Sequence, residues 1–272
     1  MRLPKFAPLL VIAGFVLVFY IRNGRSLHTR QSIHTLLDFV EIGTSNFDTI
    51  IQTANQTSRG ISVDAMKPYL EDLPDLPFVH KVNAAISGFD TKDDFAQVFF
   101  VSKKDILKYD LPSWVKGCNR VGHEHPIVAK LLEERNLQHI LQRTQVPIVS
   151  INALFLQEGI CRVKLLKIDV EGMDSELLIG YSLFLWNNPG CYADNIVFEI
   201  NSLSDRVELQ RASHALELVG YTDTGTANGT DNVGRRYNQV LDGRQWMQFV
   251  AGEHFSSKRD AEVFGRWYMQ SR

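Results

Sequence analysis

An acidic residue, a glycine and two hydroxyl-bearing residues lie close together near the start of the chain, as Glu41, Gly43, Thr44 and Ser45. The apolar residues before them predict a strand, and residues 47–57 have the apolar spacing of a helix with one buried face. A strand, a tight turn and a helix open a doubly wound α/β sheet, in which ligands bind beyond the carboxyl ends of the strands. We therefore expect these four residues to lie at a ligand site; a tight turn without a ligand is the alternative.

A second acidic residue, Asp64, ends another short strand pattern over residues 60–64. It follows the glycine by about twenty residues, a spacing that suits a carboxylate accepting hydrogen bonds from ribose hydroxyls. Together with the glycine turn, this acid predicts a nucleoside pocket, although the pattern does not specify which nucleoside.

Two further carboxylates, Asp169 and Glu171, end the strongest strand pattern of the chain, residues 163–170. Residues two apart in an extended strand point to the same side of the sheet. Two carboxylates held close together repel each other, and a nearby cation relieves that repulsion. We expect this pair to lie beside the same ligand site.

Histidines 123 and 125 end an irregular stretch, residues 103–126, that proline and glycine interrupt repeatedly. A long irregular stretch inside a compact domain is usually functional or disordered, and its aromatic residues favour an ordered lid or substrate loop. His123 and His125 could share a metal ion, with Glu124 between them, but the sequence shows no third ligand. We therefore predict no metal site; a plain surface loop is the other alternative.

The remaining patterns alternate strands and helices, as an α/β domain requires. One departure is a strand at 95–101 with no helix before it, which indicates an inserted β element and, with the irregular stretch, a substrate insertion over about 95–126. The other expected elements are a short helix at 67–73, a strand at 78–86, a helix at 127–143, a strand at 146–151, a short helix at 153–156, a helix at 175–186, a strand at 195–200, a helix from Ser204 as N-cap to 219, strands at 220–224 and 245–250, and a helix at 261–269.

The N-terminus predicts a membrane anchor. Residues 6–21 are apolar, with basic residues on both sides, and span roughly 24 Å as a helix, which suits a thin endomembrane such as the endoplasmic reticulum or Golgi. A cleaved signal peptide is the main alternative, but no small-x-small cleavage site follows. We expect a tail at 1–5, a single-pass anchor at 6–21, a stem at 22–35 and a globular domain at 36–272, in an orientation that the flanking charges leave open.

Composition excludes some partners and frameworks. The net charge is −2 and no basic run or basic aromatic stripe is present, so we expect no nucleic-acid partner. The three cysteines, at 118, 161 and 191, show no metal spacing and allow at most one disulfide. Glycosylation sequons begin at Asn55 and Asn228; because Asn55 falls on an expected helix, Asn228 is the better acceptor.

Four segments together resemble the FkbM-type methyltransferase family, within the class I methyltransferases that use S-adenosylmethionine. Lys-Ile-Asp-Val-Glu-Gly before a helix is the most specific of them. The segment from Trp114 to His125, with its Gly-Cys-Asn and His-Pro elements, resembles a eukaryotic branch. The resemblance covers roughly 36–219 and implies a seven-stranded, mostly parallel sheet with helices on both faces. The segments are 39–45 (Phe-Val-Glu-Ile-Gly-Thr-Ser), 60–65 (Gly-Ile-Ser-Val-Asp-Ala), 81–87 (Lys-Val-Asn-Ala-Ala-Ile-Ser) and 165–172 (Leu-Leu-Lys-Ile-Asp-Val-Glu-Gly).

The resemblance also implies roles for the cofactor-binding residues. Gly43, Thr44 and Ser45 should form the turn under S-adenosylmethionine, and Asp64 should bind its ribose. Glu41 should position the amino group or shape the turn; the alternative is a strand-end acid that accepts nearby N–H groups. Asn83 and Ala84 should lie near the adenine, with Asn83 as a loop hydrogen-bonding residue the alternative.

The implied reaction is methyl transfer to a hydroxyl of a glycan or small metabolite, and this acceptor rests on family analogy. Orientation supplies most of the catalysis in such a displacement, and a general base assists a hydroxyl acceptor. The alternative for Lys167 and Glu171 is a structural ion pair. The candidate bases are Asp169, Glu171, His123 and His125.

One position departs from the family pattern: Phe47 stands where these enzymes commonly have another glycine. A side chain there could narrow the approach to the methionine end of the cofactor. The first alternative function is therefore a methyltransferase-like binding module without turnover. The second is a nicotinamide-dependent oxidoreductase, which the lack of Gly-x-Gly-x-x-Gly after the first strand disfavours.

Overall fold

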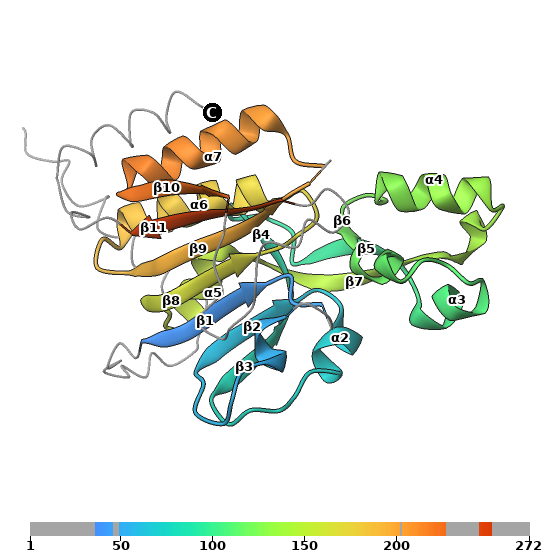
Figure 1. Cartoon of the computed structure of the whole chain (residues 1–272), viewed down its shortest axis with the longest axis horizontal. Coiled ribbons are helices and arrows are strands. Elements are labelled where there is room, and N and C mark those ends of the chain that lie inside the picture. The colour runs from blue at the N-terminus through green and yellow to red at the C-terminus, as the bar shows by residue number, and fades with distance from the viewer. Residues whose placement is uncertain (1–35, 46–48, 202, 227–244, 252–272) are drawn as a thin grey trace, which may run out of the picture. The chain divides into compact units, whose positions relative to one another are not determined.

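The computed structural model describes residues 36–45, 49–201, 203–226 and 245–251, all of which belong to one compact unit (Figure 1). Within these ranges no helix is both long and apolar enough to cross a bilayer. Several expectations fall outside the described residues: the anchor at 6–21, the stem at 22–35, Phe47, the Asn228 sequon and the helix at 261–269.

The main sheet has seven strands in the order β10-β11-β9-β8-β1-β2-β3. The five neighbouring strands β9, β8, β1, β2 and β3 run parallel to one another. Strand β11 lies between β9 and β10 and is antiparallel to both. The expected mostly parallel α/β sheet is therefore confirmed. The strands are β1 (Leu37–Ile42), β2 (Gly60–Asp64), β3 (Val79–Asn83), β8 (Arg162–Ile168), β9 (Tyr192–Ile200), β10 (Tyr221–Thr226) and β11 (Gln245–Ala251).

Helices cover both faces of this sheet because its strands are apolar on both sides. In β1, Val40 and Ile42 pack into a core with α5 (Ile151–Gln157), α6 (Asp174–Asn187) and α7 (Arg206–Leu218). Phe39 faces the other way, into a smaller core with the single 3-10 turn η1 (Ile50–Gln52) and with α2 (Lys67–Glu71). This double burial is typical of a parallel sheet.

The helix expected at 47–57 is wrong: the described part of this segment holds only η1, at Ile50–Gln52. The chain turns instead at Asn55, whose side-chain oxygen accepts hydrogen bonds from the backbone N–H and the hydroxyl of Thr57, at 2.9 and 2.7 Å. Asparagine competes with helix formation through such local bonds. Asn55 is consequently exposed in a turn, which removes the reason for discounting it as a glycosylation acceptor.

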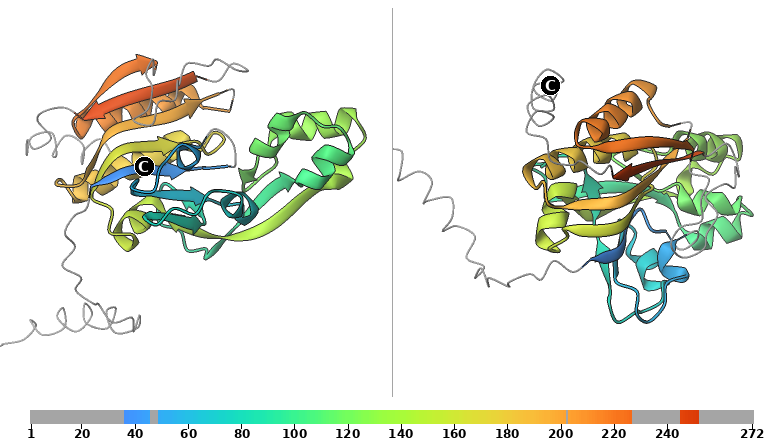
Figure 2. Two further views of the ribbon diagram at one scale, coloured as in Figure 1. Left: turned by 60° about the horizontal axis from the view of Figure 1, so that its bottom comes forward. Right: turned by 60° about the vertical axis from the view of Figure 1, so that its left-hand side comes forward.

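A second, four-stranded sheet in the order β4-β7-β5-β6 extends the insertion well beyond the expected end at 126. The strand expected at 78–86 divides at Ala84 into β3 of the main sheet and β4 of the small one. Figure 2 shows α3 and α4 at the far end of the paired β5 and β7, away from the main sheet. The elements are β4 (Ala85–Ser87), β5 (Phe95–Val101), α3 (Lys103–Lys108), η2 (Ser113–Gly117), β6 (Arg120–Val121), α4 (Pro126–Glu134), η3 (Gln138–Ile140) and β7 (Leu141–Ser150).

Local backbone conformation and capping hydrogen bonds explain three errors in the expected boundaries. The helix expected at 127–143 ends at Glu134, because Asn136 adopts a left-handed φ of 54°, a common helix terminator. The stretch expected to be irregular contains α3, capped by the Ser102 hydroxyl. Asp205, not Ser204, caps α7, since its carboxylate accepts the N–H groups of residues 207 and 208.

One disulfide joins Cys161, just before β8, to Cys191, just before β9. Cys118 is buried outside this disulfide, and its Sγ lies 3.6 Å from the carbonyl oxygen of Trp114. The expectation of at most one disulfide is thus confirmed.

Candidate active site

The strand order of the main sheet reverses direction between β1 and β8, and a pocket opens at their carboxyl ends. Open α/β sheets bind ligands at this reversal. The pocket encloses about 730 Å³ of space between protein atoms, part of which is open solvent. Its lining residues are Ile42, Gly43, Ser45, Asp64, Ala65, Met66, Ala84, Ala85, Ile86, Val98, Gly117, Asn119, Val121, Asp169, Val170, Glu171 and Met173.

Gly43 brings the end of β1 against the end of β8. Its φ is 82°, and a Cβ atom there would lie 1.7 Å from the backbone oxygen of Asp169. The N–H of Asp169 donates to the carbonyl of Ile42 at 2.9 Å, and the N–H of Gly43 donates to Val63 in β2 at 2.9 Å. A glycine is therefore required for the three strand ends to meet at the pocket.

Asp64 lies at the floor of the pocket with its carboxylate held by two backbone groups. Ser45 N–H donates to Oδ2 at 2.8 Å and Met66 N–H donates to Oδ1 at 2.6 Å. Burial raises the pKa of Asp64 to about 6; these two hydrogen bonds lower it in part, and the charge of Glu41 raises it further. A carboxylate has about four acceptor positions, so Asp64 can still accept hydrogen bonds from a ligand.

Glu41 is fully buried beneath the pocket and does not line it. Lys167 donates to its carboxylate at 2.9 Å, and so do the Thr49 hydroxyl at 2.6 Å and the Ile50 N–H at 3.0 Å. This arrangement matches the alternative of a strand-end acid that accepts nearby N–H groups. Lys167 pairs with Glu41, so the alternative ion pair of Lys167 with Glu171 is wrong.

Three more expected cofactor residues differ in position. Ala84 lines the pocket. Asn83 does not, and its amide donates to the carbonyls of Asp64 and Ala65 at 3.0 and 2.9 Å, which fixes the ends of β2 and β3 to each other. Thr44 is also buried outside the pocket lining, and its N–H donates to Val63 at 3.1 Å.

The expected pairing of Asp169 with Glu171 is present, and a third carboxylate joins it. Oxygen atoms of Asp169, Glu171 and Glu199 all lie within 4.8 Å of one another. The strand does not stay extended through this pair, because Glu171 adopts a left-handed φ of 51°. Strained backbone of this kind concentrates at functional sites.

Asp174 holds the turn that carries Glu171. Its carboxylate accepts from the N–H groups of Val170 and Gly172 at 3.3 and 3.2 Å. Burial, together with the negative charge of Asp169, raises the pKa of Asp174 well above its usual value. The turn after β8 is thus organised around a fully buried acid.

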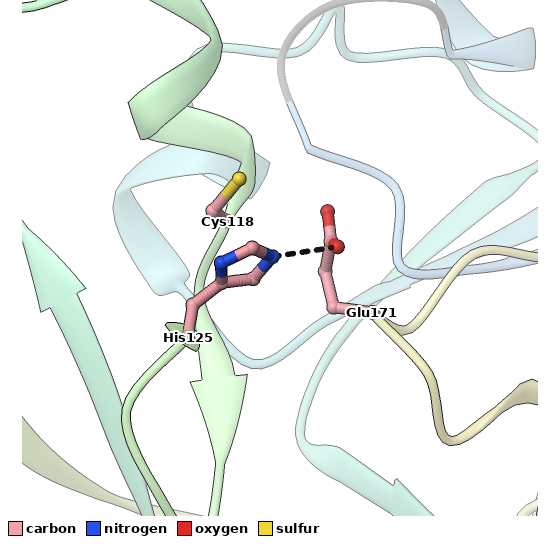
Figure 3. A group of neighbouring side chains, drawn as sticks. All are labelled: Cys118, His125 and Glu171. Carbon is pink, nitrogen blue, oxygen red and sulfur yellow. Dashed lines mark ion pairs between the residues drawn. The ribbon is translucent and has the colours of Figure 1, made fainter. Parts of the chain in front are cut away.

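The two histidines are placed very differently. His123 is exposed and lies outside the pocket lining. His125 is buried, and its Nε2 lies 3.4 Å from a carboxylate oxygen of Glu171 (Figure 3). The structure therefore brings only the second histidine to the carboxylates.

Asn119 is a pocket residue that the sequence pattern did not single out. Its Oδ1 is buried and has no hydrogen-bond partner among the described residues. An orphaned buried acceptor costs about 1–3 kcal/mol, and a ligand that donates a hydrogen bond would satisfy it. The Gly-Cys-Asn element was the available sequence signal.

These residues fit S-adenosylmethionine. The carboxylate of Asp64 suits ribose hydroxyls, the oxygen of Asn119 suits an amino group, and the acidic cluster suits a cation. A residue larger than glycine cannot occupy position 43, because its Cβ atom would clash with the backbone just after β8.

No family model matches the chain, and no curated protein matches its sequence. Among solved structures, the chain is similar to a Streptococcus pneumoniae protein proposed to be a tRNA (m1A22) methyltransferase. That similarity has a TM-score of 0.29 at 10% sequence identity, and it covers 89% of this chain and 75% of the other. A TM-score this low identifies neither a family nor a substrate, so the geometry of the site carries the proposals below.

Proposed function

We propose that this chain transfers a methyl group from S-adenosylmethionine to a hydroxyl oxygen of a glycan or small metabolite. The observation that carries the proposal is the meeting of Gly43, Asp64 and Asp169 at one pocket, from three separate segments of the sheet. Each ends or follows a strand of its own, and the three meet at the edge where open α/β sheets bind ligands.

The strand order also supports a class I methyltransferase fold. The strands from β3 to β9 follow the doubly wound pattern, and β11 runs antiparallel beside them. With the four motifs, this arrangement favours the FkbM-type family. A nicotinamide cofactor is disfavoured, since Gly43 is not followed by the further glycines of a dinucleotide loop.

The residues at the pocket have different roles in the proposed reaction. Bound S-adenosylmethionine would supply an electrophilic methyl group to the acceptor oxygen, and its sulfur would keep the electron pair of the broken carbon–sulfur bond. Asp64 binds the ribose, and Gly43 leaves room for S-adenosylmethionine at the strand ends. Asp169 lines the pocket and takes the proton from the acceptor hydroxyl, then releases it to water. His123 has no part in this scheme, because it is exposed outside the pocket.

We further propose that the domain is held by the anchor at 6–21 in the lumen of an endomembrane. The Cys161–Cys191 disulfide is typical of such an oxidising compartment, and the exposed Asn55 sequon suits it. The full chain should resist carbonate extraction, and glycosidase treatment should shift its mobility unless Asn55 and Asn228 are both replaced by Gln. A chain that is extracted by carbonate and insensitive to glycosidase contradicts this placement.

The function is tested by methyl transfer from labelled S-adenosylmethionine to a panel of glycans and small hydroxyl metabolites. Label in a product that requires Asp169 supports the proposal. Binding of the cofactor without transfer to any acceptor class supports the alternative of an inactive binding module, and binding of NAD in its place supports an oxidoreductase.

A further inference from the structure

Three buried side chains with metal-binding atoms meet beside the pocket: Cys118, His125 and Glu171, which are 6%, 4% and 6% exposed. One candidate ligand atom from each lies within 4.8 Å of the other two. Figure 3 shows the ring of His125 facing the carboxylate of Glu171, with the thiol of Cys118 beside the ring. Three separate elements supply them: the residue after η2, the residue before α4, and the turn after β8.

The distance between His125 and Glu171 suits two ligands of one tetrahedral ion. Zinc bonds to sulfur at about 2.3 Å and to nitrogen or oxygen at about 2.0–2.2 Å, so two ligand atoms in a tetrahedral site lie roughly 3.3–3.7 Å apart. Nε2 of His125 and Oε2 of Glu171 are 3.4 Å apart. That spacing is longer than a good hydrogen bond and equals a tetrahedral edge.

A second, independent observation concerns the imidazole itself. Nδ1 of His125 is buried without a hydrogen-bond partner among the described residues. When one ring nitrogen of a histidine binds a metal ion, the other nitrogen normally donates a hydrogen bond to a carboxylate, a backbone carbonyl or water. An ion at Nδ1 would satisfy this atom and leave Nε2 to Glu171, whereas an ion at Nε2 would leave Nδ1 to a partner outside the described residues.

Charge favours a cation at this point. Carboxylate oxygens of Asp169 and Glu199 lie within 4.8 Å of Glu171, and acids that close repel one another unless a positive charge or a proton intervenes. A thiolate from Cys118 would add to that negative charge. Thiolate, imidazole and carboxylate together select zinc over magnesium or calcium, which prefer oxygen ligands.

We propose that Cys118, His125 and Glu171 bind one Zn²⁺ with a fourth position left for a non-protein ligand. Binding displaces the thiol proton of Cys118 to water. The function of the ion rests on the proposed methyl transfer: Glu171 also lines the pocket, so the ion stands next to the acceptor site and lowers the pKa of an acceptor hydroxyl bound to it. The binding itself does not depend on the methyltransferase function.

The site is tested with the full chain, purified without a metal-affinity tag and stripped of metal with a chelator. Zn²⁺ binding is measured by titration against a chromophoric competitor. Co²⁺ binding is measured by absorption spectroscopy. Wild-type protein should bind one equivalent and show a thiolate-to-cobalt charge-transfer band. Cys118→Ser should lose that band, and Cys118→Ser and His125→Gln should each weaken Zn²⁺ binding at least about tenfold. His123→Gln is the matched control, two residues away and exposed, and should bind as wild type does.

Two results would overturn the site: no stoichiometric Zn²⁺ binding by folded wild-type protein, or equal binding by wild type and by Cys118→Ser with His125→Gln. If a variant fails to fold, the Zn²⁺ titration of wild-type protein still tests the proposed site. Cofactor affinity measured on the same samples separates the two proposals, because loss of S-adenosylmethionine binding with zinc binding intact contradicts only the methyltransferase function.

Discussion

Gly43 packs so closely on Asp169 that a Cβ atom at position 43 would lie 1.7 Å from the backbone oxygen of Asp169. The first residue follows β1 and the second follows β8, the two strands between which the sheet order reverses. The glycine that shapes the proposed cofactor loop therefore also fixes the backbone of the proposed general base.

Gly43→Ala should damage both the fold and the pocket. A left-handed φ costs an alanine about 1–2 kcal/mol, and a clash with backbone adds typically about 1–3 kcal/mol. We expect unfolding by denaturant to show a loss of at least about 2 kcal/mol, with little S-adenosylmethionine binding.

Gly159→Ala is the matched control for this loss. Gly159 also has a positive φ, 65°, but a Cβ atom there meets nothing within 4 Å. It should show the φ cost alone, about 1–2 kcal/mol, and unchanged cofactor affinity. Equal losses in the two variants would mean that the contact with Asp169 has no special consequence.

Cofactor affinity should depend on pH through Asp64. Burial raises its pKa to about 6 in the folded chain, so below that pH the carboxyl is protonated and is a poorer acceptor for ribose hydroxyls. Affinity should fall by up to about tenfold per pH unit below pH 6, and binding there should release a proton. Because the folded state holds this proton more tightly than the unfolded state, Asp64 lowers stability as pH rises from about 4 to about 6.

Calorimetry between about pH 5 and pH 7.5, in buffers of different ionisation enthalpy, measures both effects. Asp64→Asn isolates the group: it keeps one oxygen for the Ser45 or Met66 N–H but cannot titrate. Its affinity should be weak at every pH and nearly flat. If the variant keeps the wild-type pH profile, a different group titrates and Asp64 is not the ribose ligand.

Much of the main sheet was predictable because local patterns determine it. The strands ending at Ile42, Asp64 and Ile168 are apolar runs that stop at an acid or a glycine, and all three were predicted. The end of α4 was missed because apolar residues continue with helical spacing past Asn136; the asparagine, which tolerates the left-handed conformation that ends a helix, was the available signal.

The site could be predicted only in part, because its pairings join residues far apart in the chain. Glu41 and Lys167 lie opposite each other on neighbouring strands, although they are 126 residues apart in the chain. Neither segment alone predicts the strand register that aligns them. Cys118 and Glu171 are also far apart in the chain, yet a ligand atom of each lies within 4.8 Å of the other. Asp64 and Asp169 were predictable because each ends a strand.

Glu41 should prove structural. Lys167→Met would leave its carboxylate fully buried without this partner, and removing one member of a buried pair typically costs about 3–5 kcal/mol. The double variant Glu41→Leu with Lys167→Met should recover much of that loss by chemical denaturation. A double variant no more stable than Lys167→Met alone would contradict the pairing, and a folded Glu41→Gln variant that no longer binds cofactor would return Glu41 to the site.

Asp169→Asn should keep the fold but transfer methyl at least about tenfold more slowly, the low side of a general-base contribution. Cofactor affinity should weaken less, because the contacts of Asp64 and Asn119 remain. Single-turnover transfer from labelled S-adenosylmethionine measures the rate, and Asp93→Asn, an exposed acid on the small-sheet side, serves as the control. A wild-type rate in Asp169→Asn would mean that Asp169 is not the general base.

Calorimetric titration of the full chain with S-adenosylmethionine, and separately with NAD, tests the central claim most directly. We expect one equivalent of S-adenosylmethionine to bind, no heat from NAD, and a loss of about 1.5–3 kcal/mol of binding in Asp64→Ala, or roughly tenfold to a hundredfold in affinity. Folded wild-type protein that binds NAD in preference, or that binds S-adenosylmethionine equally well after Asp64→Ala, would contradict a methyl-donor pocket at the end of β1.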